Sequence, residues 1–330
     1  MGGIGNIVLL TPAISAFCRR FPDAKIHFLV PKNGSRQIVE HHPTIGTIIE
    51  INSQKHSLPA LINSLRKCRP DIVIAANGTN PLKCGLIGLG CGARHRLGEA
   101  FKAGRFLYNI KVPFVFEMHE AAANNALVAE LGADTGNIPP NVWTTDTDRR
   151  NAERFLRESI GERRWVGFHL GSGPAMTYKR WDTDRFVAVG RHLSKKFDCT
   201  VVIFGGPEEV PMAEETCGKI GENTVCAAGK LSIRESFCVM RQASLFISND
   251  SGPMHLAAAA GAPVIAIFGP TMDYKTSPLG NATVITAPAA CRPCYNYRPV
   301  TCTSRVCLES ITVEQVTAAA ESVLLKTGCR

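Results

Sequence analysis

The residues Asp250, Ser251, Gly252 and His255 follow a short apolar run, Leu245–Ser248, and open an alanine-rich segment. Ser251 is a typical helix N-cap, and the N–H groups in the first turn of a helix have no partner inside the helix. With a glycine, a hydroxyl and an imidazole beside them, such N–H groups favour binding of an anion such as phosphate. A capped helix with a core histidine explains the same residues without a ligand, so these four residues alone leave both interpretations open.

The surrounding stretch, Leu245–Gly269, has the pattern of a strand, a helix and a second strand. Pro253 suits the first turn of the helix, and Gly261 marks its end. The second apolar run, Val264–Phe268, then predicts a buried strand parallel to the first. The stretch therefore predicts one βαβ unit of a parallel sheet.

Two further polar loops follow predicted strands in the second half of the chain. Ser172, Gly173 and Lys179 follow one strand, and Glu208 follows the next, where its carboxylate is placed to accept hydrogen bonds, for instance from a ribose. Loops at the carboxyl ends of parallel strands meet at one edge of a sheet, which is where such folds bind ligands. Together with Asp250, these loops predict a nucleotide site at that edge.

Apolar runs of strand length alternate with helical patterns along the whole chain, which indicates an α/β protein with doubly wound parallel sheets. Strands are predicted at 25–30, 47–51, 71–76, 94–98, 165–170, 200–204, 225–227, 245–248 and 264–268. Helices are predicted at 11–21, 35–42, 58–67, 81–89, 119–131, 212–220 and 233–242. A proline pair at 139–140 and the polar segment 144–150 suggest a connection between a first domain, 1–150, and a second that begins at 151.

The chain starts on a glycine-rich stretch, Gly2–Gly5, which predicts a turn leading into the helix Thr11–Phe21. In an α/β domain such a turn normally follows a strand. Either the protein starts further upstream, or the first domain lacks its first strand and leaves a central sheet position vacant.

The run Gly88–Ala93 matches the G-x-G-x-x-A pattern of dinucleotide-binding proteins. It lies at the end of a predicted helix and before a predicted strand, the reverse of the order that pyrophosphate binding needs. A nicotinamide-dependent oxidoreductase is therefore an alternative that the sequence disfavours.

Composition and charge restrict the class of protein. Among 330 residues, 45% are hydrophobic and 20% charged, which indicates well-filled cores. No apolar run has the length of a membrane span, and thirteen scattered cysteines are typical of reduced thiols, so a cytoplasmic protein is expected. Residues 1–150 hold 17 Lys and Arg against 11 Asp and Glu. This excess suggests an acidic partner, such as a phosphorylated ligand or an anionic membrane face, whereas nucleic acid is not expected.

Four cysteines, Cys291, Cys294, Cys302 and Cys307, fall within 17 residues near the end of the chain. A set of four thiolates can hold a tetrahedral zinc ion as a structural clip. The spacing of the first pair is typical of such sites, and that of the second pair is wider. Unpaired thiols in a loop are the alternative.

The segments GGIGN, RRFPDAKI, HLGSG, KRW, GGPEE and SNDSGPMHLAAAAGAPVIAIFGPT, with the late cysteine segment, occur in the order typical of one known family. The chain resembles the ADP-heptose:lipopolysaccharide heptosyltransferases of glycosyltransferase family 9, over essentially its whole length. The resemblance implies the GT-B fold, two Rossmann-like domains with a cleft between them. The second domain would cover 151–311, and a C-terminal helix, 312–330, would pack back on the first domain.

The same resemblance implies inverting transfer of heptose from ADP-heptose to the inner core of lipopolysaccharide, without a metal or another cofactor. The partners would be a nucleotide sugar and a lipid-linked, acidic acceptor (Kdo or heptose), with peripheral contact to the inner membrane. Lys179 would hold the donor diphosphate and Glu208 the adenosine ribose. The remaining donor contacts would come from Ser172, Gly173, Asp250, Ser251, Gly252 and His255.

On the acceptor side, the resemblance implies a loop containing Gly3, Gly5 and Asn6. Much of the family has an aspartate at the position of Asn6, as the base that takes the proton of the acceptor. An amide cannot do this at neutral pH. Either Asn6 orients the acceptor while another group acts as base, or the protein binds nucleotide sugars with little or no catalysis.

Overall fold

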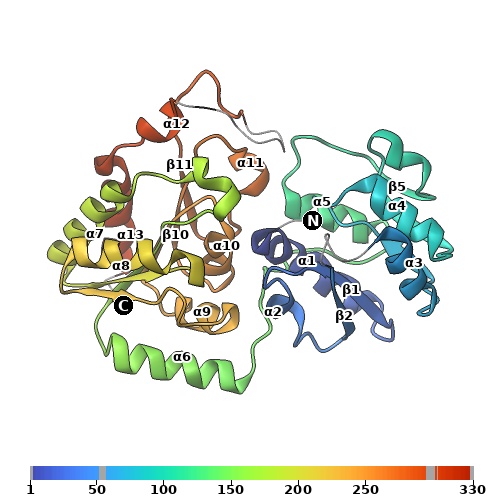
Figure 1. Ribbon diagram of the computed structural model, residues 1–330, viewed down its shortest axis with the longest axis horizontal. Helices are drawn as coiled ribbons and strands as arrows, with labels where there is room; N and C mark the ends of the chain where they lie inside the picture. Colours follow the sequence, from blue (N-terminus) through green and yellow to red (C-terminus); the bar gives the residue numbers. More distant parts are fainter. Residues whose placement is uncertain (1–2, 52–56, 295–301, 303, 328–330) are drawn as a thin grey trace. The chain divides into compact units, whose positions relative to one another are not determined.

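The computed structural model describes residues 3–51, 57–294, 302 and 304–327 (Figure 1). The chain divides into two compact units, an N-terminal unit, Met1–Asn141, and a C-terminal unit, Val142–Arg330. Both are α/β units with parallel strand pairing. Within the described ranges, no helix is long and apolar enough to cross a membrane.

The elements of the N-terminal unit are α1 (Ile4–Arg20), β1 (Ile26–Pro31), α2 (Arg36–Val39), β2 (Ile45–Ile51), α3 (Leu58–Arg66), β3 (Ile72–Ile74), α4 (Pro81–Gly90), β4 (His95–Glu99), the 3₁₀ segment η1 (Lys102–Phe106), β5 (Ile110–Val112) and α5 (Glu120–Ala129). The C-terminal unit contains α6 (Asp146–Ser159), β6 (Trp165–His169), η2 (Pro174–Lys179), α7 (Thr183–Phe197), β7 (Thr200–Phe204), η3 (Pro207–Glu209), α8 (Val210–Ile220), β8 (Thr224–Cys226), α9 (Ile233–Met240), β9 (Leu245–Asn249), α10 (Gly252–Ala259), β10 (Val264–Ile267), α11 (Asp273–Thr276), β11 (Ala282–Ile285), α12 (Val306–Glu309) and α13 (Val313–Thr327).

The C-terminal unit is a doubly wound sheet with the strand order β11-β10-β9-β6-β7-β8, all neighbours parallel. Every residue of β6, β7 and β9 is buried, as expected for strands covered on both faces. The winding reverses between β6 and β9, because β7 follows in the sheet on the side of β6 and β10 on the side of β9. At this reversal a doubly wound sheet has its ligand-binding crevice.

The C-terminal helix α13 packs in the core of the C-terminal unit. Val316, Ala320 and Leu324 are fully buried and belong to the same hydrophobic cluster as Leu193 of α7. They are spaced four residues apart and so form one helical stripe. The guanidinium of Arg164 also donates a hydrogen bond to the carbonyl of Leu324, at 2.6 Å. Residues 328–330 of the predicted helix lie outside the described residues.

The N-terminal unit contains two parallel sheets instead of one: β1 pairs with β2, and β3-β4-β5 form the other. These pairs are the two flanks of a 3-2-1-4-5-6 strand order. Among the described residues, no strand pairs with both sheets. Core residues from both flanks nevertheless share one cluster, in which Ile51 of β2 and Val73 of β3 pack with Leu61 of α3 and Ile87 of α4.

The predicted glycine turn at the start of the chain is wrong: Gly3 is an N-cap, and α1 runs unbroken from Ile4 to Arg20. Pro12 lies inside this helix, where it has no N–H to give to the carbonyl of Val8. The hydroxyl of Thr11 donates to that carbonyl instead, at 2.7 Å. This replacement lets the helix continue past the proline. Gly2 lies outside the described residues.

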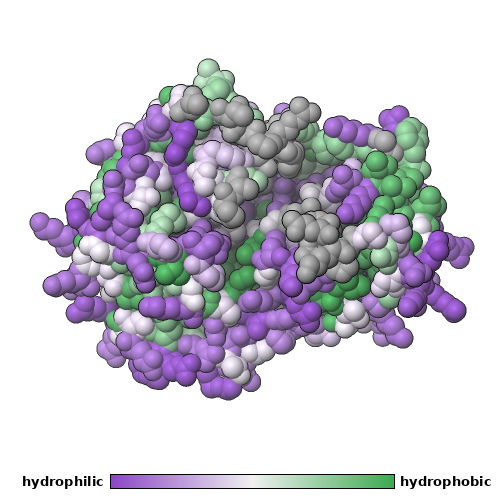
Figure 2. Space-filling view, viewed as in Figure 1, coloured by the Kyte–Doolittle hydropathy of each residue, from purple (hydrophilic) through white to green (hydrophobic). Residues whose placement is uncertain are grey.

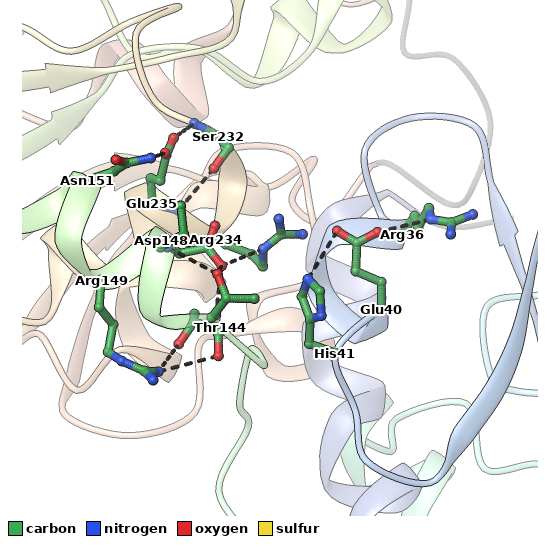
Figure 3. A network of polar contacts seen from close by, with 12 residues as sticks. Arg36, Glu40, His41, Thr144, Asp148, Arg149, Asn151, Ser232, Arg234 and Glu235 are labelled. Atoms are coloured by element: carbon green, nitrogen blue, oxygen red, sulfur yellow. Dashed lines mark hydrogen bonds and ion pairs between the residues drawn. The ribbon is translucent and has the colours of Figure 1, made fainter.

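The polar segment expected to connect the domains begins helix α6, and the two units divide after Asn141 instead of at 150. Thr145 and Asp148 form a capping box that starts this helix. Arg234 of α9 donates to the carboxylate of Asp148 at 2.9 Å, and Asn151 donates to Glu235 at 2.6 Å (Figure 3). These polar contacts fasten α6 to α9 within the C-terminal unit.

Candidate functional site

The loops after β6 and β9 meet at the strand-order reversal of the C-terminal sheet, which we call the switch-point edge. The ammonium group of Lys179 donates a hydrogen bond to a carboxylate oxygen of Asp250 at 2.7 Å, although 71 residues separate them. Their side chains are 15% and 8% exposed. A partly buried, charge-assisted contact of this kind is stronger than one on the open surface. The expected convergence of Lys179 and Asp250 is therefore present.

The N-terminus of α10 differs from the predicted cap. Ser251 is the N-cap residue, but its side chain makes no capping hydrogen bond. Its hydroxyl lies 2.9 Å from Nδ1 of His169 and 3.1 Å from the hydroxyl of Ser248. The hydroxyl therefore does not occupy the N–H groups of the first turn, which is the arrangement that anion binding at a helix N-terminus requires.

His169, the last residue of β6, links the N-terminus of α10 to the loop after β7. Its Nε2 lies 3.1 Å from a carboxylate oxygen of Glu209, while Nδ1 faces Ser251. The same carboxylate oxygen accepts the N–H of Gly206 at 3.0 Å. A Cβ at Gly171 would lie 1.5 Å from the other oxygen of Glu209, so only glycine leaves room for the carboxylate there. Three strand-end loops are thus joined through one buried histidine.

The charge of Glu209 is set by this network. Burial raises the pKa of its carboxyl, but the hydrogen bond and charge of His169, the N–H of Gly206 and the charge of Arg180 outweigh it and leave the pKa below its ordinary value. Glu209 therefore stays ionised at neutral pH and holds the imidazole of His169 in place.

Side-chain hydrogen bonds shape the loop between β6 and α7. The hydroxyl of Ser172 donates to the carbonyl of Met176 at 2.6 Å and accepts from the guanidinium of Arg180 at 3.3 Å. Gly173 has a φ of +79°, a conformation that favours glycine. Asn249, at the end of β9, accepts the N–H of Trp181 at 2.9 Å and so fastens the loop to the neighbouring strand.

The remaining predicted donor residues are placed as follows. Gly252 is the first residue of α10, and His255 is buried one turn further on. Glu208 is exposed at the same edge, whereas its neighbour Glu209 turns inward. The sequence did not single out His169 or Glu209. The spacing of Gly206 and Glu209 was the available signal, because a glutamate three residues after an N-cap commonly accepts the N–H of the N-cap residue.

In the N-terminal unit, the side chain of Asn6 is held by a carboxylate. Its Nδ2 donates to a carboxylate oxygen of Glu120 at 2.5 Å; Asn6 lies in the first turn of α1, and Glu120 is the first residue of α5. Glu120 is 3% exposed. Since the nitrogen faces the carboxylate, Oδ1 of Asn6 is oriented to accept a hydrogen bond. Gly3 is exposed at the N-cap position, and Gly5 is buried in the first turn of α1.

Cys291, Cys294, Cys302 and Cys307 line one small pocket together with Tyr178, Pro270, Arg305 and Val306. The first three are exposed and Cys307 is buried. The N–H of Cys294 donates to the carbonyl of Pro270 at 3.0 Å, and the guanidinium of Arg305 donates to the carbonyl of Arg180. The cysteine segment is thus tied to the loop that carries Lys179.

The four thiols influence one another electrostatically. Burial first, then the neighbouring thiols, raises the pKa of Cys294 and of Cys307. Backbone and hydroxyl hydrogen bonds at 304–305 lower the pKa of Cys302. In the described part of the chain, no group of three or more His, Cys, Asp or Glu side chains is arranged to hold a metal ion.

Comparison with known proteins decides the family. The profile described as "Glycosyltransferase family 9 (heptosyltransferase)" matches residues 58–301, about three quarters of the chain. The chain belongs to glycosyltransferase family 9. Over 300 residues it is 35% identical to lipooligosaccharide heptosyltransferase 2 of Haemophilus influenzae, covering 86% of this chain and 85% of that protein. It is 26% identical to lipopolysaccharide heptosyltransferase 3 of Escherichia coli, covering 84% of each.

Solved structures of family 9 glycosyltransferases share this fold. The E. coli ADP-heptose lps heptosyltransferase II has a TM-score of 0.76 at 22% identity, covering 99% of this chain and 97% of that one. The family 9 glycosyl transferase of Veillonella parvula has a TM-score of 0.80 at 23% identity, covering 99% and 95%. The expected α/β fold of the GT-B type is therefore confirmed.

Membership of glycosyltransferase family 9 removes the support for the oxidoreductase alternative. The glycine motif Gly88–Ala93 lies across the end of α4 and the turn before β4. It is not at the start of a helix, where pyrophosphate would meet free N–H groups.

Proposed function

We propose that this glycosyltransferase transfers heptose from ADP-heptose to a lipid-linked, acidic acceptor of the lipopolysaccharide inner core, either Kdo or an existing heptose. The observation that carries the proposal is the cation and helix N-terminus at the switch-point edge, formed by Lys179, Asp250 and the start of α10. Support also comes from the solved E. coli heptosyltransferase WaaC with ADP, which has a TM-score of 0.70 to this chain.

On the donor side, the diphosphate lies against Lys179 and the first-turn N–H groups of α10. An acceptor hydroxyl attacks the anomeric carbon from the opposite face; its new C–O bond forms while the bond to the diphosphate breaks. The negative charge that builds on ADP is stabilised by the ammonium group and by the helix N-terminus. Without donor, Asp250 holds Lys179 in position for this role.

His169 and Glu209 orient the donor site. Nε2 of His169 faces the ionised carboxylate of Glu209, and Nδ1 faces the hydroxyl of Ser251. This keeps the Ser251 side chain from capping α10. The first-turn N–H groups of α10 can then donate hydrogen bonds to the phosphate oxygens. Glu208, exposed beside them, takes the adenosine ribose.

On the acceptor side, Asn6 orients Glu120, which acts as the base. The acceptor hydroxyl donates its hydrogen bond to the carboxylate of Glu120, which receives the proton as the new C–O bond forms, while Asn6 positions that carboxylate through Nδ2. This assignment supplies a base even though residue 6 is an asparagine and not an aspartate.

Glu120→Gln keeps a hydrogen-bond acceptor for Asn6 but removes the base, so kcat is expected to fall by about 100-fold or more with little change in KM. Asn6→Asp is expected to shift the acid limb of the kcat–pH profile to higher pH, since two adjacent carboxylates resist ionising together. Steady-state kinetics over a pH range measures both. Glu130→Gln, at the exposed end of α5, is the matched control. Wild-type kcat in Glu120→Gln would assign the base elsewhere.

A sugar-nucleotide-binding protein without catalysis is the second candidate, and the amide at position 6 favours it. Incubation with ADP-heptose and a heptose-deficient lipopolysaccharide acceptor separates the two, with the product followed by mass spectrometry. A mass increase of one heptose supports transfer. ADP binding in calorimetry without any product supports the second candidate, and binding of NAD but not ADP contradicts both.

We also propose that the four late cysteines hold a structural zinc ion. Four thiolates suit tetrahedral zinc, and they line one pocket beside Tyr178 and Arg305. A dication there would favour the thiolates against the burial, and then the neighbouring thiols, that raise the pKa of Cys294 and Cys307.

Protein purified without a histidine tag is expected to contain about one zinc per chain. Cys291→Ser with Cys294→Ser should lose the metal, while Cys68→Ser, at an exposed thiol of the N-terminal unit, should keep it. Metal analysis by mass spectrometry measures this. A zinc content near zero in the wild type would leave the cysteines as unpaired thiols.

A further inference from the structure

Helix α4 is apolar on the face that it turns to solvent. Leu82, Leu86 and Leu89 are 46%, 38% and 54% exposed and, three or four residues apart, form one stripe. The opposite face buries Ile87 and Gly88 in the unit. A surface helix ordinarily carries polar residues on its outer face, so the packing of the unit does not account for this stripe.

The 3₁₀ segment η1 extends the apolar stripe. A Cβ at Gly104 would lie 2.9 Å from Cβ of Pro81 and 3.2 Å from the nitrogen of Leu82, so η1 lies directly on the start of α4. The hydroxyl of Tyr108 donates to the carbonyl of Pro81 at 2.5 Å and fixes this contact. At its end, Phe106 is 75% exposed, more than any other exposed large hydrophobic side chain in the described residues.

The segment after β5 adds to the same surface. Phe114 packs against Phe101, the N-cap of η1, with ring centroids 4.2 Å apart and the ring planes tilted by 37°. The next two residues, Val115 and Phe116, are 46% and 43% exposed. Of nine exposed large hydrophobics in the described residues, six fall between 82 and 116. Figure 2 shows apolar surface over α4, at the right-hand edge of the view.

Positive charge accompanies this surface. Residues 81–118 contain six lysines and arginines against two glutamates. Lys102 lies over the ring of Phe101, at 4.9 Å from its centroid, and Arg105 over that of Phe106, at 4.7 Å. Exposed aliphatic and aromatic side chains with cations beside them are typical of surfaces that enter the headgroup region of an anionic bilayer.

We infer that the outward face of α4, η1 and residues 115–116, here called the α4 surface, docks the N-terminal unit on an anionic lipid bilayer. The leucines and Phe106 enter the boundary between headgroups and acyl chains, while Lys102 and Arg105 contact lipid phosphates. A second copy of the chain is the less suitable occupant, because a two-fold interface would oppose the same cations to one another. The inference does not depend on the proposed transfer reaction.

Co-sedimentation with vesicles tests this docking without donor or acceptor. Wild-type protein is expected to bind vesicles of phosphatidylcholine with phosphatidylglycerol, to bind pure phosphatidylcholine poorly, and to lose affinity as salt rises. The triple variant Leu82→Gln, Leu86→Gln, Leu89→Gln should bind about 100-fold more weakly, because it lacks the three leucine side chains whose transfer from water into the bilayer stabilises the bound state. The double variant Lys102→Glu, Arg105→Glu should weaken binding to anionic vesicles at least about tenfold and leave binding to pure phosphatidylcholine vesicles unchanged.

Leu325→Gln is the matched control, since Leu325 is 63% exposed on α13 of the C-terminal unit, and its binding should equal that of the wild type. Circular dichroism checks that each variant is folded, and turnover of a delipidated, soluble acceptor should be unchanged by all of them. Absence of wild-type binding, or equal binding by the triple leucine variant, would overturn the inference. A wild-type dimer that the triple variant converts to a monomer would assign the surface to a second copy.

Discussion

Replacing Lys179 by alanine is expected to weaken ADP binding by about 10- to 100-fold and to lower kcat/KM by about 100- to 1000-fold. The first effect is the loss of one charge-assisted hydrogen bond to the diphosphate. The second is larger because charge on the departing ADP grows toward the transition state. Calorimetric titration with ADP and steady-state kinetics with ADP-heptose measure the two.

Asp250→Ala should also weaken ADP binding, because the partly buried ammonium of Lys179 loses the carboxylate that holds it. Lys195→Ala serves as the control: it removes an exposed lysine from α7 and should change neither the affinity for ADP nor kcat/KM. Unchanged ADP affinity in both Lys179→Ala and Asp250→Ala would show that the pyrophosphate binds elsewhere. The proposed donor site would then be wrong, whatever the activity of the protein.

The second large effect is on stability, at Glu209. Glu209→Ala is expected to lower the free energy of unfolding of the C-terminal unit by about 3 kcal/mol at pH 7, because it leaves the buried His169 and the half-buried N–H of Gly206 without their acceptor. Glu209→Gln keeps part of these hydrogen bonds and should cost about 1 kcal/mol. Glu208→Gln changes an exposed neighbour and should stay within about 0.5 kcal/mol of the wild type.

The pH dependence of this effect has a definite sign. Because folding lowers the pKa of Glu209, its charge stabilises the folded state in full above the ordinary carboxyl pKa of 4.5, and this contribution is lost as pH falls through the lower folded value. The stability difference between wild type and Glu209→Gln should therefore shrink below about pH 4.5.

Urea unfolding followed by tryptophan fluorescence reports on the relevant unit, because all three tryptophans, at 143, 165 and 181, lie in the C-terminal unit. A chain of two units need not unfold in one step, so a probe confined to one unit is required. A stability difference that does not change between pH 7 and pH 4 would mean that the Glu209 carboxylate does not stabilise the fold through its charge.

The sequence by itself determined much of the C-terminal unit. Apolar runs of strand length alternate there with helices whose caps are local, as at Asp182, whose side chain accepts two N–H groups at the start of α7, and at Gly261, whose φ is +88°. Since consecutive strands of such a pattern are parallel, the loops with Lys179 and Asp250 had to emerge at one edge. The pattern was therefore sufficient to predict that the two loops meet, whereas the ion pair between Lys179 and Asp250 is a finding of the structure.

Tertiary structure alone decided which side chains face that edge. Glu208 and Glu209 are chemically identical neighbours, and only the space left by Gly171 and the position of His169 select the second for burial. Ser251 has the residue type of a cap, yet a histidine 82 residues away takes its hydroxyl. The carboxylate next to Asn6 comes from position 120, a contact that no local pattern contains.

The placement of α13 was also decided by tertiary structure. Periodicity determines which face of a helix is buried, but not which elements cover that face.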